Sequence, residues 1–182
     1  MAKERLVIIC PGRGSYTRES SGYLNSKKNI ADQEISWMNN QREATNLPTL
    51  NDLDSSTFKS KIHMIGVNAS PLIYACSYVD FFSINKNKYE IVGITGNSMG
   101  WYTTLSLSGV LTFQNAFKLI NVMSSLTKDD NGGQIIYPIV NENWQIDEST
   151  YSMVLNEIKK VGAYVSINLG GYIVIAGKQD SL

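Results

Sequence analysis

The pentapeptide Gly96-Asn97-Ser98-Met99-Gly100, here called the elbow, decides how this chain is expected to fold. It follows residues 89–95, a mostly apolar segment of the kind that parallel sheets bury. It precedes residues 101–108, which are predicted to form a short helix closed by Gly109. A glycine two residues to each side of the serine lets a strand turn sharply into a helix without Cβ clashes. The pattern therefore places Ser98 at the apex of a strand-to-helix turn.

A serine at such an apex is a candidate nucleophile. Its hydroxyl lies near the start of a helix, where backbone N–H groups and the helix dipole favour a developing negative charge on oxygen. The alternative is a tight structural turn with an incidental serine, because a five-residue pattern is short enough to occur by chance. The strand before the elbow and the helix after it favour a nucleophilic Ser98.

A second glycine-rich turn lies near the start of the chain. Residues 5–10 form a continuous apolar segment, which predicts a buried first strand. This strand runs directly into Pro11-Gly12-Arg13-Gly14-Ser15, here called the first loop, whose glycines permit close backbone approach or a positive φ. A strand that delivers its chain into a tight loop is typical of a site.

Two core helices are predicted around these turns. Ser70 and Pro71 are typical of an N-cap and a first helical position, so a helix is expected from Ser70 through Ile84. Residues 20–60 are polar and weakly periodic, with helical pieces expected near residues 31–40 and no function assigned. Thr112 is expected to cap a further helix, whose apolar stripe consists of Phe113, Ala116, Phe117, Ile120 and Met123.

The pattern changes after residues 128–133, which are a loop by composition. The order β-α-β-β is predicted, with a turn at Gly170-Gly171 between the last two strands. The elements are a strand at 135–140, a helix at 148–161, and strands at 163–169 and 172–176. A ferredoxin-like domain needs one more helix and one more strand. The sequence is therefore expected to end within such a domain.

Composition excludes several classes of function. The 182 residues include 16 basic and 16 acidic side chains, so no net charge draws the chain to nucleic acid or an acidic membrane. No apolar run approaches the roughly 18 residues of a membrane span, and no CxxC or HExxH pattern indicates a metal. Cys10 and Cys76 lie in apolar segments, which favours core thiols in a reducing compartment. We expect a soluble, cytoplasmic protein without nucleic-acid, membrane or metal partners.

Three blocks in the same order resemble one enzyme family. Residues 96–102 and 108–116 look like the nucleophile elbow and following helix of the malonyl-CoA:acyl carrier protein transacylases, which usually read G-H-S-L-G-E-Y at the elbow. The first loop resembles the family's P-G-Q-G-S, and Val174-Ile175-Ala176-Gly177 resembles the V-I-A-G end of a strand in its small domain. The likeness covers nearly the whole chain. It implies an α/β fold with an α/β-hydrolase-like parallel-sheet core, residues 1–131, and an inserted ferredoxin-like small subdomain, residues 132–182, incomplete here.

The resemblance also implies a reaction. Ser98 would take an acyl group from a coenzyme A thioester and pass it to the thiol of an acyl carrier protein, as in fatty-acid or polyketide synthesis, with no bound cofactor. The oxyanion hole would consist of the backbone N–H groups of Met99 and Arg13, and Asn168 matches a small-domain asparagine near the site. A solvated charge at Arg13 and a structural polar residue at Asn168 are the simpler alternatives.

Three departures from the family pattern limit this reading. Met123 stands where the family has an arginine that pairs with the malonyl carboxylate, so a neutral acyl group is expected to be preferred. Asn97 replaces the usual histidine before the nucleophile and keeps a hydrogen-bonding side chain. The downstream histidine that acts as general base has no counterpart. The chain's one histidine, His63, is expected at the surface or at a helix start.

Two other functions stay open on this sequence. The same kind of elbow serves serine hydrolases such as thioesterases and lipases. An inactive fragment that retains the fold and lacks the catalytic pair is the non-enzymatic alternative. The first loop and the β-α-β-β unit favour the transferase.

Overall fold

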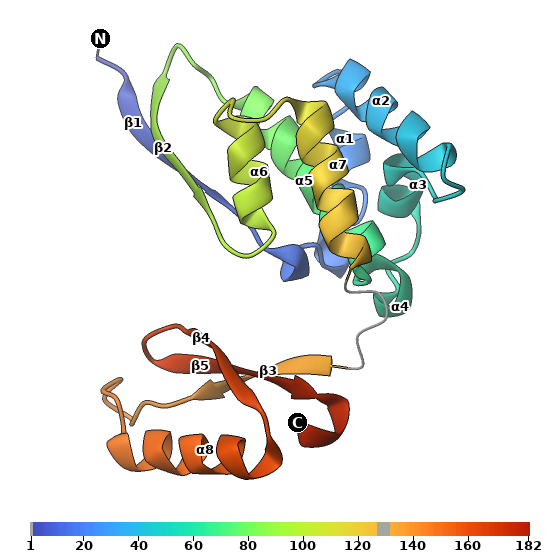
Figure 1. Cartoon of the computed structure of the whole chain (residues 1–182). Helices are drawn as coiled ribbons and strands as arrows, with labels where there is room; N and C mark the ends of the chain where they lie inside the picture. Colours follow the sequence, from blue (N-terminus) through green and yellow to red (C-terminus); the bar gives the residue numbers. More distant parts are fainter. Residues whose placement is uncertain (1, 127–131) are drawn as a thin grey trace. The chain divides into compact units, whose positions relative to one another are not determined.

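The chain divides into two compact units, Met1–Lys128 and Asp129–Leu182, in a computed structural model that describes residues 2–126 and 132–182. Figure 1 shows the elements of both units. Of the loop predicted at residues 128–133, residues 128–131 lie outside the described residues. The predicted boundary between the two domains, after residue 131, lies there as well.

The first unit is built on two parallel strands, β1 (Glu4–Cys10) and β2 (Tyr89–Gly96). Its helices lie together on one side of this strand pair (Figure 1). Side chains of β1 alternate between the two faces, and Val7 and Ile9 are 56% and 73% exposed. The prediction of a buried first strand is therefore wrong, because helices in the described part of this unit cover only one face of the sheet.

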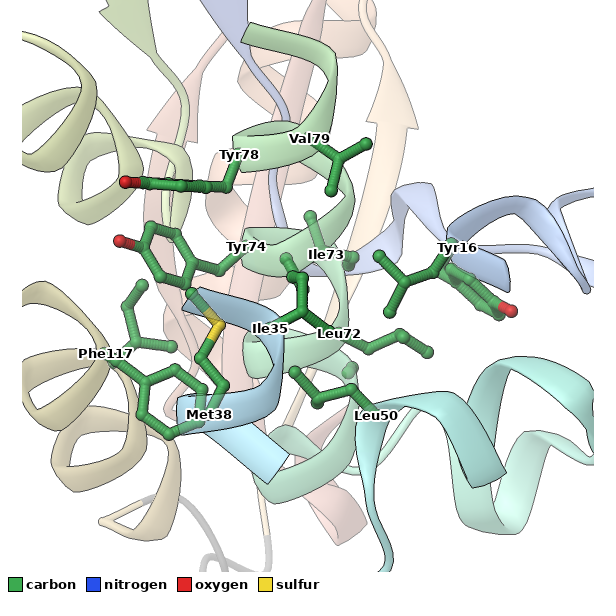
Figure 2. Packing of buried hydrophobic residues seen from close by; sticks show 14 of the residues in the cluster. Tyr16, Ile35, Met38, Leu50, Leu72, Ile73, Tyr74, Tyr78, Val79 and Phe117 are labelled. Atoms are coloured by element: carbon green, nitrogen blue, oxygen red, sulfur yellow. The ribbon is translucent and has the colours of Figure 1, made fainter. Parts of the chain in front are cut away.

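Helix α5 (Gly66–Ser83) runs through the middle of the first unit and contributes many of its core side chains (Figure 2). Helices α6 (Gly100–Leu107) and α7 (Phe113–Ser125) pack against it. Thr112 Oγ1 accepts a hydrogen bond from the Asn115 N–H at 3.2 Å, which confirms the predicted cap of α7. The remaining elements are α1 (Tyr23–Ser26), α2 (Asp32–Glu43), α3 (Leu50–Ser55), α4 (Ser60–His63) and 3-10 turns at Arg13–Ser15 and Arg18–Ser20.

Helix α5 begins more than a turn earlier than predicted. Its N-cap is Ile65, so Pro71 lies inside the helix. A proline there has no N–H to donate to the carbonyl of Val67, four residues earlier. The buried Arg42 side chain supplies that hydrogen bond, because its Nη1 donates to the Val67 carbonyl oxygen at 2.8 Å. The predicted start at Ser70 is wrong because a donor from another helix satisfies the carbonyl that Pro71 leaves.

The second unit has the predicted β-α-β-β order. Strands β3 (Gly132–Pro138), β5 (Tyr172–Lys178) and β4 (Tyr164–Asn168) form an antiparallel sheet in the order β3-β5-β4. Helix α8 (Glu148–Val161) lies against this sheet, and a 3-10 turn, Gln179–Ser181, follows β5 (Figure 1). The strands β3 and β4 on either side of α8 are separated by β5, which is the split β-α-β arrangement. Its core consists of Ile139, Val154, Ile158, Ala163, Ile173 and Ile175.

Candidate functional site

The elbow has the backbone geometry of a strained, exposed turn. Ser98 has φ +52°, in the left-handed region that residues other than glycine rarely adopt. Its side chain is exposed, whereas the next residue, Met99, is buried and is the N-cap of α6. Met99 therefore contributes one of the backbone N–H groups at a helix start that have no partner within the helix. Strain of this kind persists where the surrounding structure holds it in place.

The two glycines of the elbow are required by close backbone contacts. A Cβ atom on Gly96 would lie 2.3 Å from the backbone carbon and oxygen of Gly100. A Cβ atom on Gly100 would lie 2.2 Å from the carbonyl oxygen of Cys10, at the end of β1. Neither contact leaves room for any side chain. The spacing of the two glycines around Ser98 thus reflects packing of the turn on itself and on β1.

Hydrogen bonds fasten the elbow to the neighbouring strand. The Asn97 N–H donates to the Cys10 carbonyl at 3.2 Å, and the Gly100 N–H donates to the Asn97 carbonyl at 2.8 Å. The Trp101 N–H donates to the Ser98 carbonyl at 3.1 Å. Ser98 is therefore held at the apex by backbone bonds on both sides of it. Asn97 is exposed, so its side chain is accessible from the solvent beside Ser98.

The first loop lies directly against the elbow. A Cβ atom on Gly12 would lie 3.7 Å from Ser98 Cβ and 3.4 Å from the Asn97 carbonyl oxygen. Gly12 has φ −80°, and Gly14 is not among the residues with positive φ. Of the two roles expected for these glycines, Gly12 serves close approach. Arg13, the next residue, begins a 3-10 turn beside the serine.

Met123 and Asn168, two other predicted site residues, lie in different units of the chain. Met123 lies in the last turn of α7, and its side chain is 37% exposed, so it is only partly included in the buried stripe of that helix. Asn168 ends β4 in the second unit, where its Oδ1 accepts a hydrogen bond from the Gly170 N–H at 3.0 Å. This bond closes the turn between β4 and β5. It gives Asn168 a structural role in its own unit.

His63 is buried and is the last residue of α4, so its predicted place at the surface or at a helix start is wrong. Its Nδ1 accepts a hydrogen bond from the Lys59 N–H at 3.0 Å, and its Nε2 lies 3.0 Å from the Leu53 carbonyl oxygen. Nδ1 also lies 3.1 Å from the Lys59 carbonyl oxygen. The ring stacks on Phe58 at a centroid distance of 5.1 Å. Because backbone groups of residues 53–59 engage both nitrogens, His63 has no nitrogen left to act as a base for Ser98.

Neither cysteine competes with Ser98 as a nucleophile. Burial raises the pKa of the Cys76 thiol to about 12, and the nearby carboxylates of Asp54 and Asp80 add to this shift. Burial also raises the pKa of Cys10, which a hydrogen bond to Thr104 partly offsets. Both thiols are therefore protonated at neutral pH and unreactive. Across residues 2–126 and 132–182, no group of three or more His, Cys, Asp or Glu side chains is placed to hold a metal ion.

Sequence reasoning missed a polar cluster under the first loop. Tyr16 donates from its hydroxyl to Asp54 Oδ1 at 2.8 Å, and both residues are buried. Asn25 donates from its backbone N–H and from its side-chain Nδ2 to Asp54 Oδ2, each at 2.8 Å. Burial, together with Asp54, raises the pKa of Tyr16. No short motif marks these three residues, because they come together only through the packing of separate segments.

Several solved structures with a similar fold are malonyl transacylases. An acyl-carrier-protein S-malonyltransferase from Bartonella henselae matches with a TM-score of 0.68 and 17% identity, over 97% of this chain and 56% of that one. A malonyl-CoA:ACP transacylase from Synechocystis sp. PCC 6803 matches with a TM-score of 0.74 and 15% identity, over 96% and 55%. A malonyl transacylase in complex with its type II polyketide acyl carrier protein matches with a TM-score of 0.69 and 19% identity, over 98% and 56%.

These matches confirm the predicted fold class. Sequence identities of 15–19% establish a shared fold and no more. The chain spans little more than half the length of the transacylases that it matches. No family model matches the sequence, and a sequence search of curated proteins finds no match. None of the helices within the described ranges is long and apolar enough to cross a membrane.

Proposed function

We propose that Ser98 is the nucleophile of an acyltransferase that moves an acyl group from a coenzyme A thioester to the thiol of an acyl carrier protein. One observation carries the proposal: an exposed serine at φ +52° lies beside a helix start and against the first loop. Two backbone segments, the start of α6 and the first loop, lie beside this serine, and their N–H groups would form the oxyanion hole. The fold shared with malonyl transacylases supports the same chemistry.

The reaction proceeds in two transfers. Ser98 Oγ attacks the thioester carbonyl carbon, and the N–H groups of Met99 and Arg13 stabilise the oxyanion that forms. The C–S bond breaks, an ester forms on Ser98, and the coenzyme A thiolate leaves and takes up the proton that the serine lost. The carrier thiol then attacks the ester carbonyl, so a new C–S bond forms, the C–O bond breaks and the proton of the carrier thiol passes to Ser98 Oγ. An acyl carrier protein is bound in one of the similar structures, which supports this partner.

The acyl group is expected to be neutral. A dicarboxylic acyl group brings a carboxylate that must lose water at the site, and a guanidinium would compensate by a bidentate pair. The family resemblance aligns Met123 with the arginine that supplies this guanidinium. Met123 is partly exposed in the last turn of α7 and offers a thioether instead. Acetyl and longer neutral acyl groups avoid the desolvation of an anion. We therefore expect acetyl-CoA to acylate Ser98 faster than malonyl-CoA.

Acylation by this chain alone is expected to be slow. A serine hydroxyl has a pKa far above neutral, so it needs a base to become a good nucleophile. The sequence contains one histidine, and both nitrogens of His63 are engaged by backbone groups. The oxyanion donors then act without a base, which leaves a residual reaction. Robust turnover by these 182 residues would contradict this expectation.

Intact-mass spectrometry tests the proposal. The chain is incubated with acetyl-CoA or malonyl-CoA for hours, the mass increment is followed with time, and peptide mapping locates the modified residue. A single increment on Ser98, absent in Ser98→Ala, is expected, with acetyl ahead of malonyl. Met123→Arg should reverse the preference. No increment from either thioester contradicts the proposed nucleophile, and a faster reaction with malonyl-CoA contradicts the proposed selectivity.

The lifetime of the ester separates a transferase from a serine hydrolase. An acyl-Ser98 that persists in buffer and is discharged by a phosphopantetheine thiol supports transfer to a carrier protein. Rapid loss of the acyl group to water at the same pH supports hydrolysis. The cytoplasmic location expected from the cysteine usage stays a prediction.

A further inference from the structure

The first loop is short and has little regular structure of its own. Its one regular feature is the 3-10 turn Arg13–Ser15, closed by a hydrogen bond of 3.3 Å from the Ser15 N–H to the Gly12 carbonyl. None of the residues in that turn is buried. A turn of three residues with exposed side chains loses much conformational entropy when it is fixed in one geometry. Contacts outside this turn therefore help to set its position against Ser98.

Tyr16, the residue that follows the loop, provides such an anchor. Its side chain is 5% exposed and belongs to the core of the first unit (Figure 2). The hydroxyl donates to Asp54 Oδ1 at 2.8 Å, and the ring lies parallel to that of His63 at a centroid distance of 6.2 Å. The side chain is thus fixed at its tip and along its ring, within one residue of the turn that carries Arg13.

The partner of Tyr16 is itself held firmly. Asp54 is fully buried and ends no ion pair among the described residues, so its carboxylate depends on neutral donors. Tyr16 supplies one, and Asn25 supplies two, through its backbone N–H and its Nδ2. Each donor to such a buried carboxylate is restricted to a narrow range of geometries, because losing any one of these hydrogen bonds would leave a buried charge without compensation. The anchor is therefore stiffer than a surface hydrogen bond.

We propose that Tyr16 and Asp54 are positioning residues, which fix the Arg13 N–H where the oxyanion on acyl-Ser98 develops. This inference rests on the proposed function, and it assigns a purpose to a buried cluster that has none in the reaction itself. It acts through the Arg13 amide, since neither side chain reaches the acyl group in the proposed mechanism. Loosening the anchor should slow acylation more than it weakens substrate binding, because the donor is needed for the transition state.

Tyr16→Phe removes the anchoring hydroxyl and keeps the ring. Its matched control is Tyr74→Phe, because the Tyr74 hydroxyl also makes a buried hydrogen bond, 2.7 Å to Ser106 Oγ. Figure 2 shows the two rings on opposite sides of α5. Two measurements on the full chain are compared: the ¹⁵N order parameter of the Arg13 amide, and the initial rate of Ser98 acylation by acetyl-CoA. Thermal unfolding of both variants is recorded to match their stability.

The order parameter of the Arg13 amide is expected near about 0.85 in the unmodified chain and below about 0.6 in Tyr16→Phe. The acylation rate should fall about tenfold, less than the 10²–10³-fold that removal of an oxyanion donor causes. Tyr74→Phe should leave the Arg13 order parameter near about 0.85 and change the acylation rate by no more than about twofold. Equal effects of the two variants, or an Arg13 order parameter that Tyr16→Phe leaves unchanged, would overturn the proposal. A loosened loop with an unchanged acylation rate would overturn it as well.

The design separates this inference from the function beneath it. If the unmodified chain takes no acyl group from either thioester, the proposed function fails, and positioning for that chemistry fails with it. If the unmodified chain is acylated but Tyr16→Phe retains both the rate and the loop order, only the positioning role fails.

Discussion

Replacing Gly100 by alanine tests whether the elbow depends on the close approach between its backbone and β1. A Cβ atom there would lie 2.2 Å from the Cys10 carbonyl oxygen and 2.9 Å from the Pro11 carbonyl oxygen. Ordinary van der Waals contact of a Cβ atom begins at 3.4 Å, so the elbow and β1 must separate by roughly 1 Å. The blocking atoms belong to the backbone and cannot rotate away. We expect the free energy of unfolding to fall by about 3 kcal/mol, the upper end for overpacking.

Gly14→Ala is the matched control, because it introduces the same methyl group at a glycine of the neighbouring loop. A Cβ atom on Gly14 would meet nothing within 4 Å, and its φ is not positive. This variant should stay within about 0.5 kcal/mol of the unmodified chain. Urea unfolding followed by tryptophan fluorescence gives the comparison, since Trp37 and Trp101 lie in the first unit.

The same pair of variants reports on the site. A displacement of about 1 Å between a nucleophile and its oxyanion donors can lower a rate about 10²-fold. Gly100→Ala should therefore abolish measurable acylation of Ser98, whereas Gly14→Ala should retain it. Equal unfolding free energies for the two variants would refute the steric reasoning, whatever the acylation rates.

Three further predictions follow from named contacts. Arg42→Met should lower the free energy of unfolding by about 3 kcal/mol, because it leaves the Val67 carbonyl and other buried acceptors without a donor. In a Pro71→Ala background, where the helix N–H is restored, the loss should be about 1 kcal/mol smaller. Equal losses in the two backgrounds, measured by urea unfolding, would contradict this. Ser98→Gly should abolish acylation and raise the free energy of unfolding by about 1 kcal/mol, because glycine relieves the strain of φ +52°, and a lowered stability would contradict it. Asp147 caps α8, and hydrogen bonds from Ser149 and Thr150 lower its pKa from 3.8 to about 2. Its stabilisation is therefore complete above pH 3.8 and lost as the pH falls through about 2, so the difference in unfolding temperature from Asp147→Ala should vanish over that range; a difference that does not change with pH would contradict the assignment.

Local features of the fold could be predicted from the sequence. The elbow, the cap at Thr112 and the β-α-β-β order each depend on residues close together in the chain. The start of α5 could not, because the donor that makes Pro71 acceptable comes from Arg42, 25 residues before the Val67 carbonyl that it satisfies. A donor at that separation leaves no periodic signal in the sequence.

The burial of individual residues could not be predicted from the sequence pattern either. The apolar run in β1 predicts a strand, but exposure of Val7 and Ile9 depends on which face the helices cover. His63 shows the reverse error, since a polar residue expected at the surface is buried and both of its ring nitrogens lie within hydrogen-bonding distance of backbone groups. Both outcomes depend on packing between elements. Of the candidate site, the elbow and the first loop were therefore predictable, whereas the Tyr16–Asp54 anchor was not.

The meeting of these two glycine-rich turns depends on one irregularity in the β1–β2 ladder. Leu6 pairs with Ile91, but the register shifts before Val7, which pairs with Gly93, so the last pair is Cys10 with Gly96. Without the shift, Cys10 would pair with Thr95. The first loop would then begin opposite a residue one position before its present partner in β2. The extra residue in β2 is a register irregularity of the β-bulge kind, and β-bulges redirect strands beside functional sites. The contact of Gly100 with the Cys10 carbonyl, and of Gly12 with Ser98, both require the shifted register. The geometry around Ser98 is thus set by the register of two strands as much as by the elbow itself.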